Sequence, residues 1–131
     1  IHSDSTKTKP GSRHYIYAED VARAVMFIVE NKDKLMNKKE DIYGAKCLKV
    51  NIPGAKELNN LEIAELISKY SGLELNFELV DFHSSRPGHD LRYALDGTLI
   101  KSLGWNHKYS IEDSFEKLIH WFLDNPEWLD F

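Results

Sequence analysis

The chain has 131 residues, of which 42% are hydrophobic, 11% aromatic and 29% charged. This length predicts one compact domain over residues 1–131, and the composition excludes global disorder. The net charge of −4 argues against nonspecific binding to nucleic acid or to an acidic membrane, so a few placed cations must hold any anionic ligand. The single cysteine, Cys47, allows no intramolecular disulfide and favours a reducing, cytoplasmic compartment.

The start of the chain carries little structural information. Residues 2–12 are polar, contain a Pro10-Gly11 pair and predict an exposed lead-in that adds nothing to the core. The chain contains no apolar run near the roughly 18 residues that span a bilayer, and its start lacks the charged-then-apolar order of a signal peptide. Because the first residue is Ile1 rather than Met, we expect a piece of something longer.

The first half of the chain predicts two short strands around one helix. Alternation over 15–17 indicates a strand, and a helix over 18–30 follows. That helix has one apolar stripe, formed by Val21, Ala24, Val25, Ile28 and Val29. The charged stretch 31–41 is expected to be a solvated loop, and the apolar run 47–52 a buried strand that stops at Pro53.

The second half predicts three helices and one strand. Asn59 and Glu62 have the spacing of a capping box at the start of a helix. Gly72 supplies the left-handed residue that ends the same helix. Alternation over 74–80 indicates a half-buried strand. Asp96 is expected to cap a short helix that ends at Gly104.

The last helix is the most clearly marked of all. Ser110 is its expected cap, and Asn125-Pro126 ends it. Its apolar positions recur at intervals of three and four: Ile111, Phe115, Leu118, Ile119 and Phe122. Four helices and about three short strands in mixed order predict an α+β fold.

Several kinds of catalytic or binding site have no matching pattern. The seven glycines are never two or three residues apart, so the chain has no dinucleotide loop and no complete Rossmann domain. None of the six tyrosines is followed by Lys four residues later, which removes a Tyr-x-x-x-Lys proton-transfer pair. One cysteine and no H-E-x-x-H helix argue against a zinc site, and Cys47 in an apolar run is interpreted as a small buried hydrophobe.

Residues 84–105 hold the densest group of polar side chains. Arg86, His89, Asp90 and Arg92 lie within seven positions around a Pro-Gly turn. Two guanidinium groups on a rigid turn suit a phosphate or diphosphate, since the planar fork donates two hydrogen bonds at once. The alternative is structural: Arg92 pairs locally with Asp90, and His89 caps the turn.

Three segments in order carry a resemblance to a known family. The run RPGHDLRYALD, with LGW and WFLDNPEW after it, resembles the C-terminal part of the dTDP-glucose 4,6-dehydratases, which are extended short-chain dehydrogenases/reductases. The segments SRHYIYAEDVARAV and VNIPGAKELNNLEIAELI resemble two earlier stretches that the same family shares with sugar-nucleotide epimerases and decarboxylases. The resemblance implies that this chain is a substrate-binding fragment, about a third of an enzyme.

The resemblance also implies four substrate-binding residues. Arg13 matches an arginine that grips the nucleotide diphosphate, and Asn60 matches an asparagine that contacts the same nucleotide. Arg86 and His89 match the Arg-Pro-Gly-His turn at the substrate. The bottom-up alternatives are a surface charge for Arg13 and a share in the helix cap for Asn60.

The resemblance finally implies a division of labour. In the full-length parent, NAD would oxidise C4 of the sugar, water would leave across C5 and C6, and hydride would return to C6. This chain would supply no catalytic or cofactor-binding residue, would be inactive alone and would bind nucleotide sugar weakly. Its helix over 18–30 and its strand over 47–52 would normally pack against the missing nucleotide-binding domain, so without that domain they would expose an apolar patch that favours self-association.

Two other readings stay open. Departures at Ser85, Val50, Pro53 and Ala55 allow a different nucleotide-sugar epimerase or dehydratase as the parent. A stand-alone module that binds a nucleotide or a protein and catalyses nothing is the second.

Overall fold

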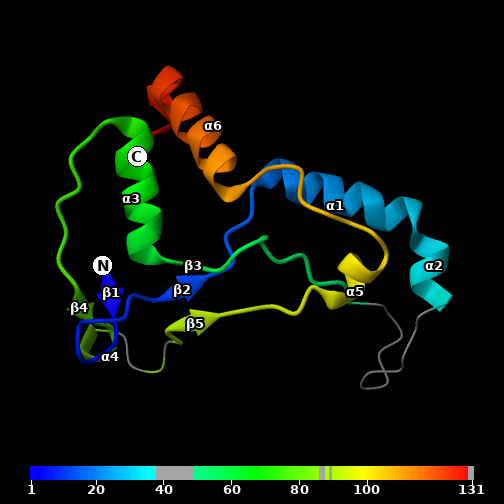
Figure 1. Cartoon of the computed structure of the whole chain (residues 1–131), viewed down its shortest axis with the longest axis horizontal. Helices are drawn as coiled ribbons and strands as arrows, with labels where there is room; N and C mark the ends of the chain where they lie inside the picture. The colour runs from blue at the N-terminus through cyan, green and yellow to red at the C-terminus, as the bar shows by residue number, and fades with distance from the viewer. Residues whose placement is uncertain (38–48, 86–87, 89, 130–131) are drawn as a thin grey trace.

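A computed structural model describes residues 1–37, 49–85, 88 and 90–129 of the chain, and it has an α+β fold (Figure 1). In chain order the elements are β1 (His2–Ser3), β2 (Ser12–Arg13), α1 (Ala18–Glu30), α2 (Lys32–Asn37), β3 (Leu58–Asn59), α3 (Asn60–Ser71), β4 (Val80–Asp81), α4 (Phe82–Ser85), β5 (Arg92–Tyr93), α5 (Thr98–Ser102), α6 (Ile111–Asp124) and the 3₁₀ turn η1 (Pro126–Trp128). The predicted fold class is therefore confirmed.

Two small sheets join distant parts of the sequence. β2 is the central strand of one sheet, antiparallel to β3 and parallel to β5. The other sheet pairs β1 with β4 in parallel. In Figure 1 the three-stranded sheet runs through the middle of the molecule, with α3 and α6 above it and α1 and α5 to its right.

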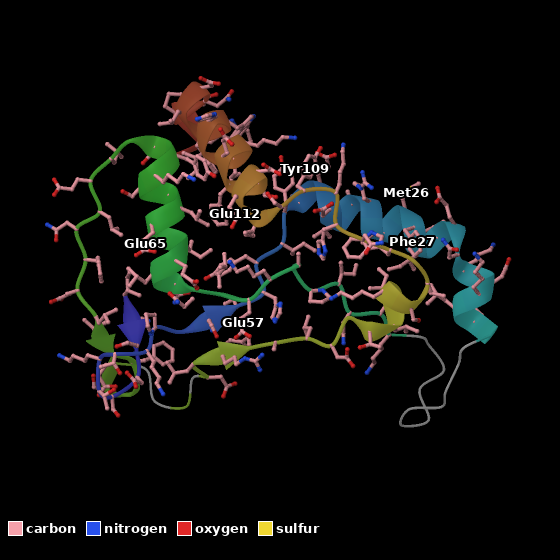
Figure 2. All side chains as sticks on the ribbon, viewed as in Figure 1. Met26, Phe27, Glu57, Glu65, Tyr109 and Glu112 are labelled. Atoms are coloured by element: carbon pink, nitrogen blue, oxygen red, sulfur yellow. The ribbon has the colours of Figure 1, made fainter. Side chains whose placement is uncertain are left out.

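The main core lies between α1 and α5. Ala24, Ile100 and Trp105 are buried there. Partly buried apolar side chains surround them: Ile16, Phe27, Ile28, Val50 and Ile52. Figure 2 shows Phe27 on the side of α1 that faces α5 and Met26 on the opposite side.

The helix ends follow the local signals in the sequence. The Asn59 side chain accepts hydrogen bonds from the amides of Leu61 and Glu62, and the Glu62 carboxylate accepts from the Asn59 amide, which completes the predicted capping box. Gly72 has φ 73° at the other end of the helix. Ser110 Oγ accepts from the Asp113 amide at the start of α6, as predicted.

The predicted strands are where sequence reasoning went wrong. Strand pairing of β2 ends at Arg13, so residues 15–17 are not a strand. Residues 49–52 of the predicted strand 47–52 form no ladder, while 47–48 lie outside the described residues. Of 74–80, only Val80 pairs. Each observed ladder is two residues long, and such ladders are too short for apolar periodicity to detect.

Two polar segments are more ordered than expected. The lead-in is not wholly exposed, because Ser3 is fully buried and His2–Ser3 pairs with β4. Within the stretch expected to be a solvated loop, Lys32–Asn37 forms a helix, α2, and its Leu35 is only 1% exposed. Residues 38–41 of that stretch lie outside the described residues. One buried side chain in a charged segment gives no periodic signal.

The predicted apolar stripe of α1 is covered on one side only. Ala24 is fully buried, whereas Val25 and Val29 are 48% and 58% exposed. Met26 and Met36 are also more than half exposed, so α1 and α2 present an apolar face to the surroundings. No helix in the described part of the chain is both long and apolar enough to span a membrane.

Candidate functional site

Strand β2 sets the position of Arg13. In the ladder, Arg13 lies opposite Leu58 of β3 and Tyr93 of β5. Its guanidinium carbon is 4.2 Å from the centre of the Tyr93 ring, and its Nη1 donates to the carbonyls of Ser12 at 2.6 Å and Leu91 at 3.1 Å. These contacts hold the positive charge of Arg13 at the sheet, close to the start of α3. Arg13 is therefore not a freely moving surface charge.

Asn60 begins α3 next to the residue that caps it. The cap role belongs to Asn59, whose side-chain oxygen accepts both amide protons. The Asn60 side chain does not cap the helix, and its backbone amide donates to the Gly11 carbonyl at 2.8 Å. The structure thus separates the two roles that the sequence left open for Asn60.

The side-chain amide of Asn60 is held by a tyrosine that sequence reasoning did not single out. The Tyr15 hydroxyl donates to Asn60 Oδ1 at 2.7 Å. Partial burial raises the pKa of the Tyr15 hydroxyl above its ordinary value, although the nearby Arg13 charge opposes the rise. Tyr15 therefore keeps its proton and remains a hydrogen-bond donor through the physiological pH range.

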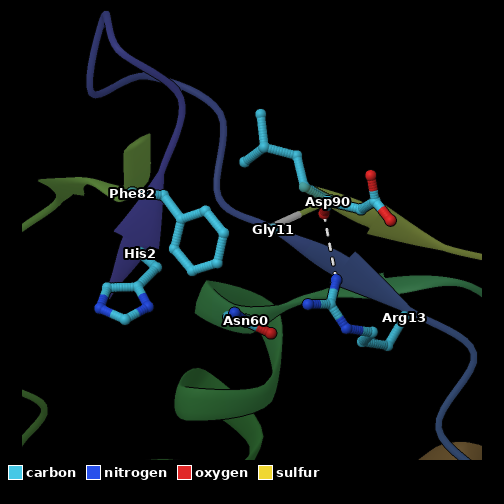
Figure 3. A pocket seen from close by; sticks show the side chains of 7 residues that line it. His2, Gly11, Arg13, Asn60, Phe82 and Asp90 are labelled. Atoms are coloured by element: carbon cyan, nitrogen blue, oxygen red, sulfur yellow. Dashed lines mark hydrogen bonds between the residues drawn. The ribbon is translucent and has the colours of Figure 1, made fainter. Parts of the chain in front are cut away.

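Arg13 and Asn60 meet in one pocket of about 140 Å³ (Figure 3). Its described lining comprises His2, Gly11, Arg13, Asn60, Phe82, Asp90 and Leu91. His2 and Phe82 form its aromatic side, with ring centres 4.9 Å apart. Figure 3 shows Arg13 on the other side, linked to the Leu91 carbonyl. The pocket thus places the Arg13 cation and the Asn60 side-chain amide beside an aromatic surface, with Asp90 also in its lining.

Gly11 keeps the space between Arg13 and Asn60 open. A Cβ atom at this position would lie 3.1 Å from the Leu91 carbonyl oxygen and 3.5 Å from Asn60 Nδ2. It would also lie 3.7 Å from Arg13 Nη1. A side chain here would take up the polar part of the pocket.

Glu57 joins the strands that carry the site. Its carboxylate accepts two hydrogen bonds from Arg92, at 2.7 and 2.8 Å, and one from Ser12 Oγ at 2.5 Å. These bonds, with Arg92 the largest contributor, lower the pKa of Glu57 to about 2. His14 Nε2 lies 3.8 Å from the same carboxylate. Arg92 thus pairs with Glu57 and not with Asp90, the local partner that the structural alternative gave it.

The other two predicted substrate-binding residues, Arg86 and His89, lie outside the described residues. Of the turn between them, Gly88 has a left-handed φ of 86°. Asp90, which follows the turn, lines the pocket with Arg13 and Asn60. Of the four candidate residues, the structure describes Arg13 and Asn60, and both line this pocket.

Neither a metal site nor a dinucleotide site fits the described residues. They contain no group of three or more His, Cys, Asp or Glu side chains that would hold a metal ion. Gly72 and Gly104 have positive φ but come after helices, whereas a dinucleotide loop needs glycines just before one. Within the described residues, Gly72 and Gly104 therefore do not form a loop of that kind.

Comparison with known proteins identifies the class of the fold. A crystal structure of dTDP-glucose 4,6-dehydratase from Bacillus anthracis, in complex with NAD, superposes with a TM-score of 0.69 at 24% identity. It matches 98% of this chain, which corresponds to 35% of that protein. The fold is thus that of one part of a dTDP-glucose 4,6-dehydratase. No protein-family profile matches the chain.

Sequence relatives agree with this fold. An Escherichia coli dTDP-glucose 4,6-dehydratase is 37% identical over 127 residues, which cover 88% of this chain and 32% of the relative. An Arabidopsis thaliana trifunctional UDP-glucose 4,6-dehydratase, 3,5-epimerase and reductase is 30% identical, with 98% of this chain and 17% of the relative covered. Over most of its length, the chain is homologous to dTDP-glucose 4,6-dehydratases, and the matching segment makes up about a third of the length of those proteins.

Proposed function

We propose that this chain forms the part of a nucleotide-sugar 4,6-dehydratase that binds the nucleotide diphosphate of the substrate. The observation that carries the proposal is the convergence of Arg13 and Asn60, from β2 and the start of α3, on one pocket. A fixed guanidinium beside the Asn60 side-chain amide suits a diphosphate, because the positive charge and the amide donor act on the same anion.

The proposal divides the reaction between this chain and the rest of the parent. The pocket binds and orients the substrate. The sequence has no closely spaced glycines and no Tyr-x-x-x-Lys pair, so NAD binding and proton transfer belong to other parts of the parent. This chain alone is therefore a binding element without dehydratase activity.

The test replaces Arg13 and Asn60 by Ala in the longest reading frame that contains this chain. Each substitution should raise KM for the nucleotide sugar about tenfold, the loss of one charge-assisted hydrogen bond. Arg23→Ala is the matched control, because Arg23 is an exposed arginine on α1 that does not line the pocket. Unchanged KM and kcat in both pocket variants would refute the diphosphate assignment.

A UDP-sugar is the second candidate substrate, since the Arabidopsis relative is named for UDP-glucose. Turnover of dTDP-glucose and UDP-glucose by the same protein decides between them. A protein that binds dTDP or UDP through Arg13 but forms no 4-keto-6-deoxy sugar would instead be a binding module.

A further inference from the structure

We infer that Tyr15 is a positioning residue that fixes the side-chain amide of Asn60 with its NH₂ group toward the nucleotide diphosphate. The inference rests on the proposed function, because it gives the Asn60 amide a ligand. Tyr15 lies two residues after Arg13, so one short stretch of chain would supply the cation and orient the second donor.

The first step is that the backbone leaves this amide available. The Asn60 amide nitrogen of the main chain is fixed to the Gly11 carbonyl, and Asn59 alone caps α3. The backbone of Asn60 is therefore fixed, while its side chain takes no part in capping the helix.

The second step concerns which end of the amide faces Tyr15. With Oδ1 toward Tyr15, the hydroxyl proton has an acceptor at 2.7 Å. Rotation of the amide by 180° would put NH₂ against the hydroxyl and leave the hydroxyl proton without an acceptor among the described residues. Because a part-buried donor without a partner costs free energy, the hydrogen bond selects the first orientation.

The third step is that the selected orientation aims a free donor at the pocket. Asn60 Nδ2 has no hydrogen-bond partner within the described part of the chain, and it lies near the open space over Gly11. Arg13 Nη1 borders the same space. A diphosphate oxygen placed there would accept from Asn60 Nδ2 beside the positive charge of Arg13, whereas a rotated amide would present its oxygen and repel the anion.

The test uses Tyr15→Phe, which removes one hydroxyl and keeps the ring. In the longest reading frame that contains this chain, it should raise KM for the nucleotide sugar about fivefold and leave kcat unchanged, the loss of one neutral hydrogen bond. Tyr17→Phe is the control, because the Tyr17 ring contacts Tyr109 edge-on and its hydroxyl has no partner within the described residues. The same variants are titrated with dTDP and with UDP, which reports binding apart from turnover.

Two variants of Asn60 separate a positioning role from a structural one. In an Asn60→Ala background, Tyr15→Phe should have no further effect, because the group it orients is gone. Asn60→Asp keeps an acceptor for Tyr15 but replaces the donor by a negative oxygen, so it should weaken binding more than Asn60→Ala does.

The outcomes keep the two proposals apart. If Asn60→Ala weakens binding but Tyr15→Phe does not, or if Asn60→Asp binds as tightly as the unmodified protein, the inference about Tyr15 is overturned and the proposed function stands. If Asn60→Ala and Arg13→Ala both leave binding and turnover unchanged, the proposed function fails and this inference fails with it.

Discussion

Replacement of Asp20 by Ala should destabilise the chain more than replacement of any other carboxylate that the sequence places on the surface. The sequence places Asp20 in the charged first turn of α1, yet its side chain is almost fully buried. Its Oδ1 accepts the Lys108 backbone amide at 3.0 Å, and Arg23 Nε approaches it at 3.9 Å. One carboxylate therefore ties α1 to the segment that leads into α6.

The cost has two parts. Removal of the carboxylate loses one charge-assisted hydrogen bond, about 1.5 to 3 kcal/mol, and leaves the Lys108 amide without its partner. Loss of the favourable interaction between the Asp20 charge and the N-terminus of α1 costs about a further 0.3 to 1 kcal/mol. We therefore expect Asp20→Ala to lower the free energy of unfolding by about 2 to 4 kcal/mol, and Asp20→Asn, which keeps an acceptor, by about half as much.

Urea unfolding of the chain at low micromolar concentration, followed by far-UV circular dichroism, measures both values. Asp113→Ala is the control, because Asp113 is an exposed carboxylate in the first turn of α6. It should cost only the helix-charge contribution of about 0.3 to 1 kcal/mol. A loss below about 0.5 kcal/mol for Asp20→Ala, or equal losses for Asp20→Ala and Asp20→Asn, would refute the reasoning.

Four further predictions concern the site and the surface. Gly11→Ala should fill the polar part of the pocket and weaken nucleotide binding, measured by dTDP titration of the full-length protein; unchanged affinity would show that ligand does not use this space. The Glu57 carboxyl, with its pKa lowered from 4.5 to about 2, should contribute stability above pH 4.5 that is lost as pH falls toward 2, and Glu57→Gln should flatten that acid limb in pH-dependent unfolding. The isolated chain should form no 4-keto-6-deoxy sugar and bind dTDP at best at about millimolar strength, weaker in salt, because two arginine contacts do not offset the cost of immobilising a ligand. It should also self-associate through the apolar face of α1, so a strictly monomeric species in sedimentation at high micromolar concentration would count against that surface.

The helices were predictable because their signals are local. Asn59, Glu62 and Gly72 fix both ends of α3 within a few residues of the chain, and Ser110 does the same for the start of α6. The sheets were not predictable in the same way. Each ladder is two residues long and pairs segments up to 80 residues apart, so its signal is a long-range hydrogen-bond pattern and not a period in the sequence.

The site residues show the same difference between local and long-range signals. Family resemblance pointed to Arg13 and Asn60, and the structure brings them together. The sequence pattern indicates only a strand at Tyr15 and no role in the site, although the spacing of two residues from Arg13 in an extended segment is a signal that both side chains lie on one side. Glu57 gave no such signal, because its partners Ser12 and Arg92 are 45 and 35 residues away.

Gly54 shows why a single sequence conceals the reason for a residue. After Pro53 it reads as an ordinary turn glycine, and the sequence supports no more than that. In the structure, a Cβ at Gly54 would lie 1.8 Å from the Tyr15 carbonyl oxygen, so only glycine permits this close approach of two backbones. The approach brings the segment before β3 against the segment after β2, and His14 Nδ1 lies 3.3 Å from the Gly54 carbonyl oxygen. The position of Tyr15, and through it the orientation of Asn60, therefore depends on the absence of a side chain 39 residues further along the chain.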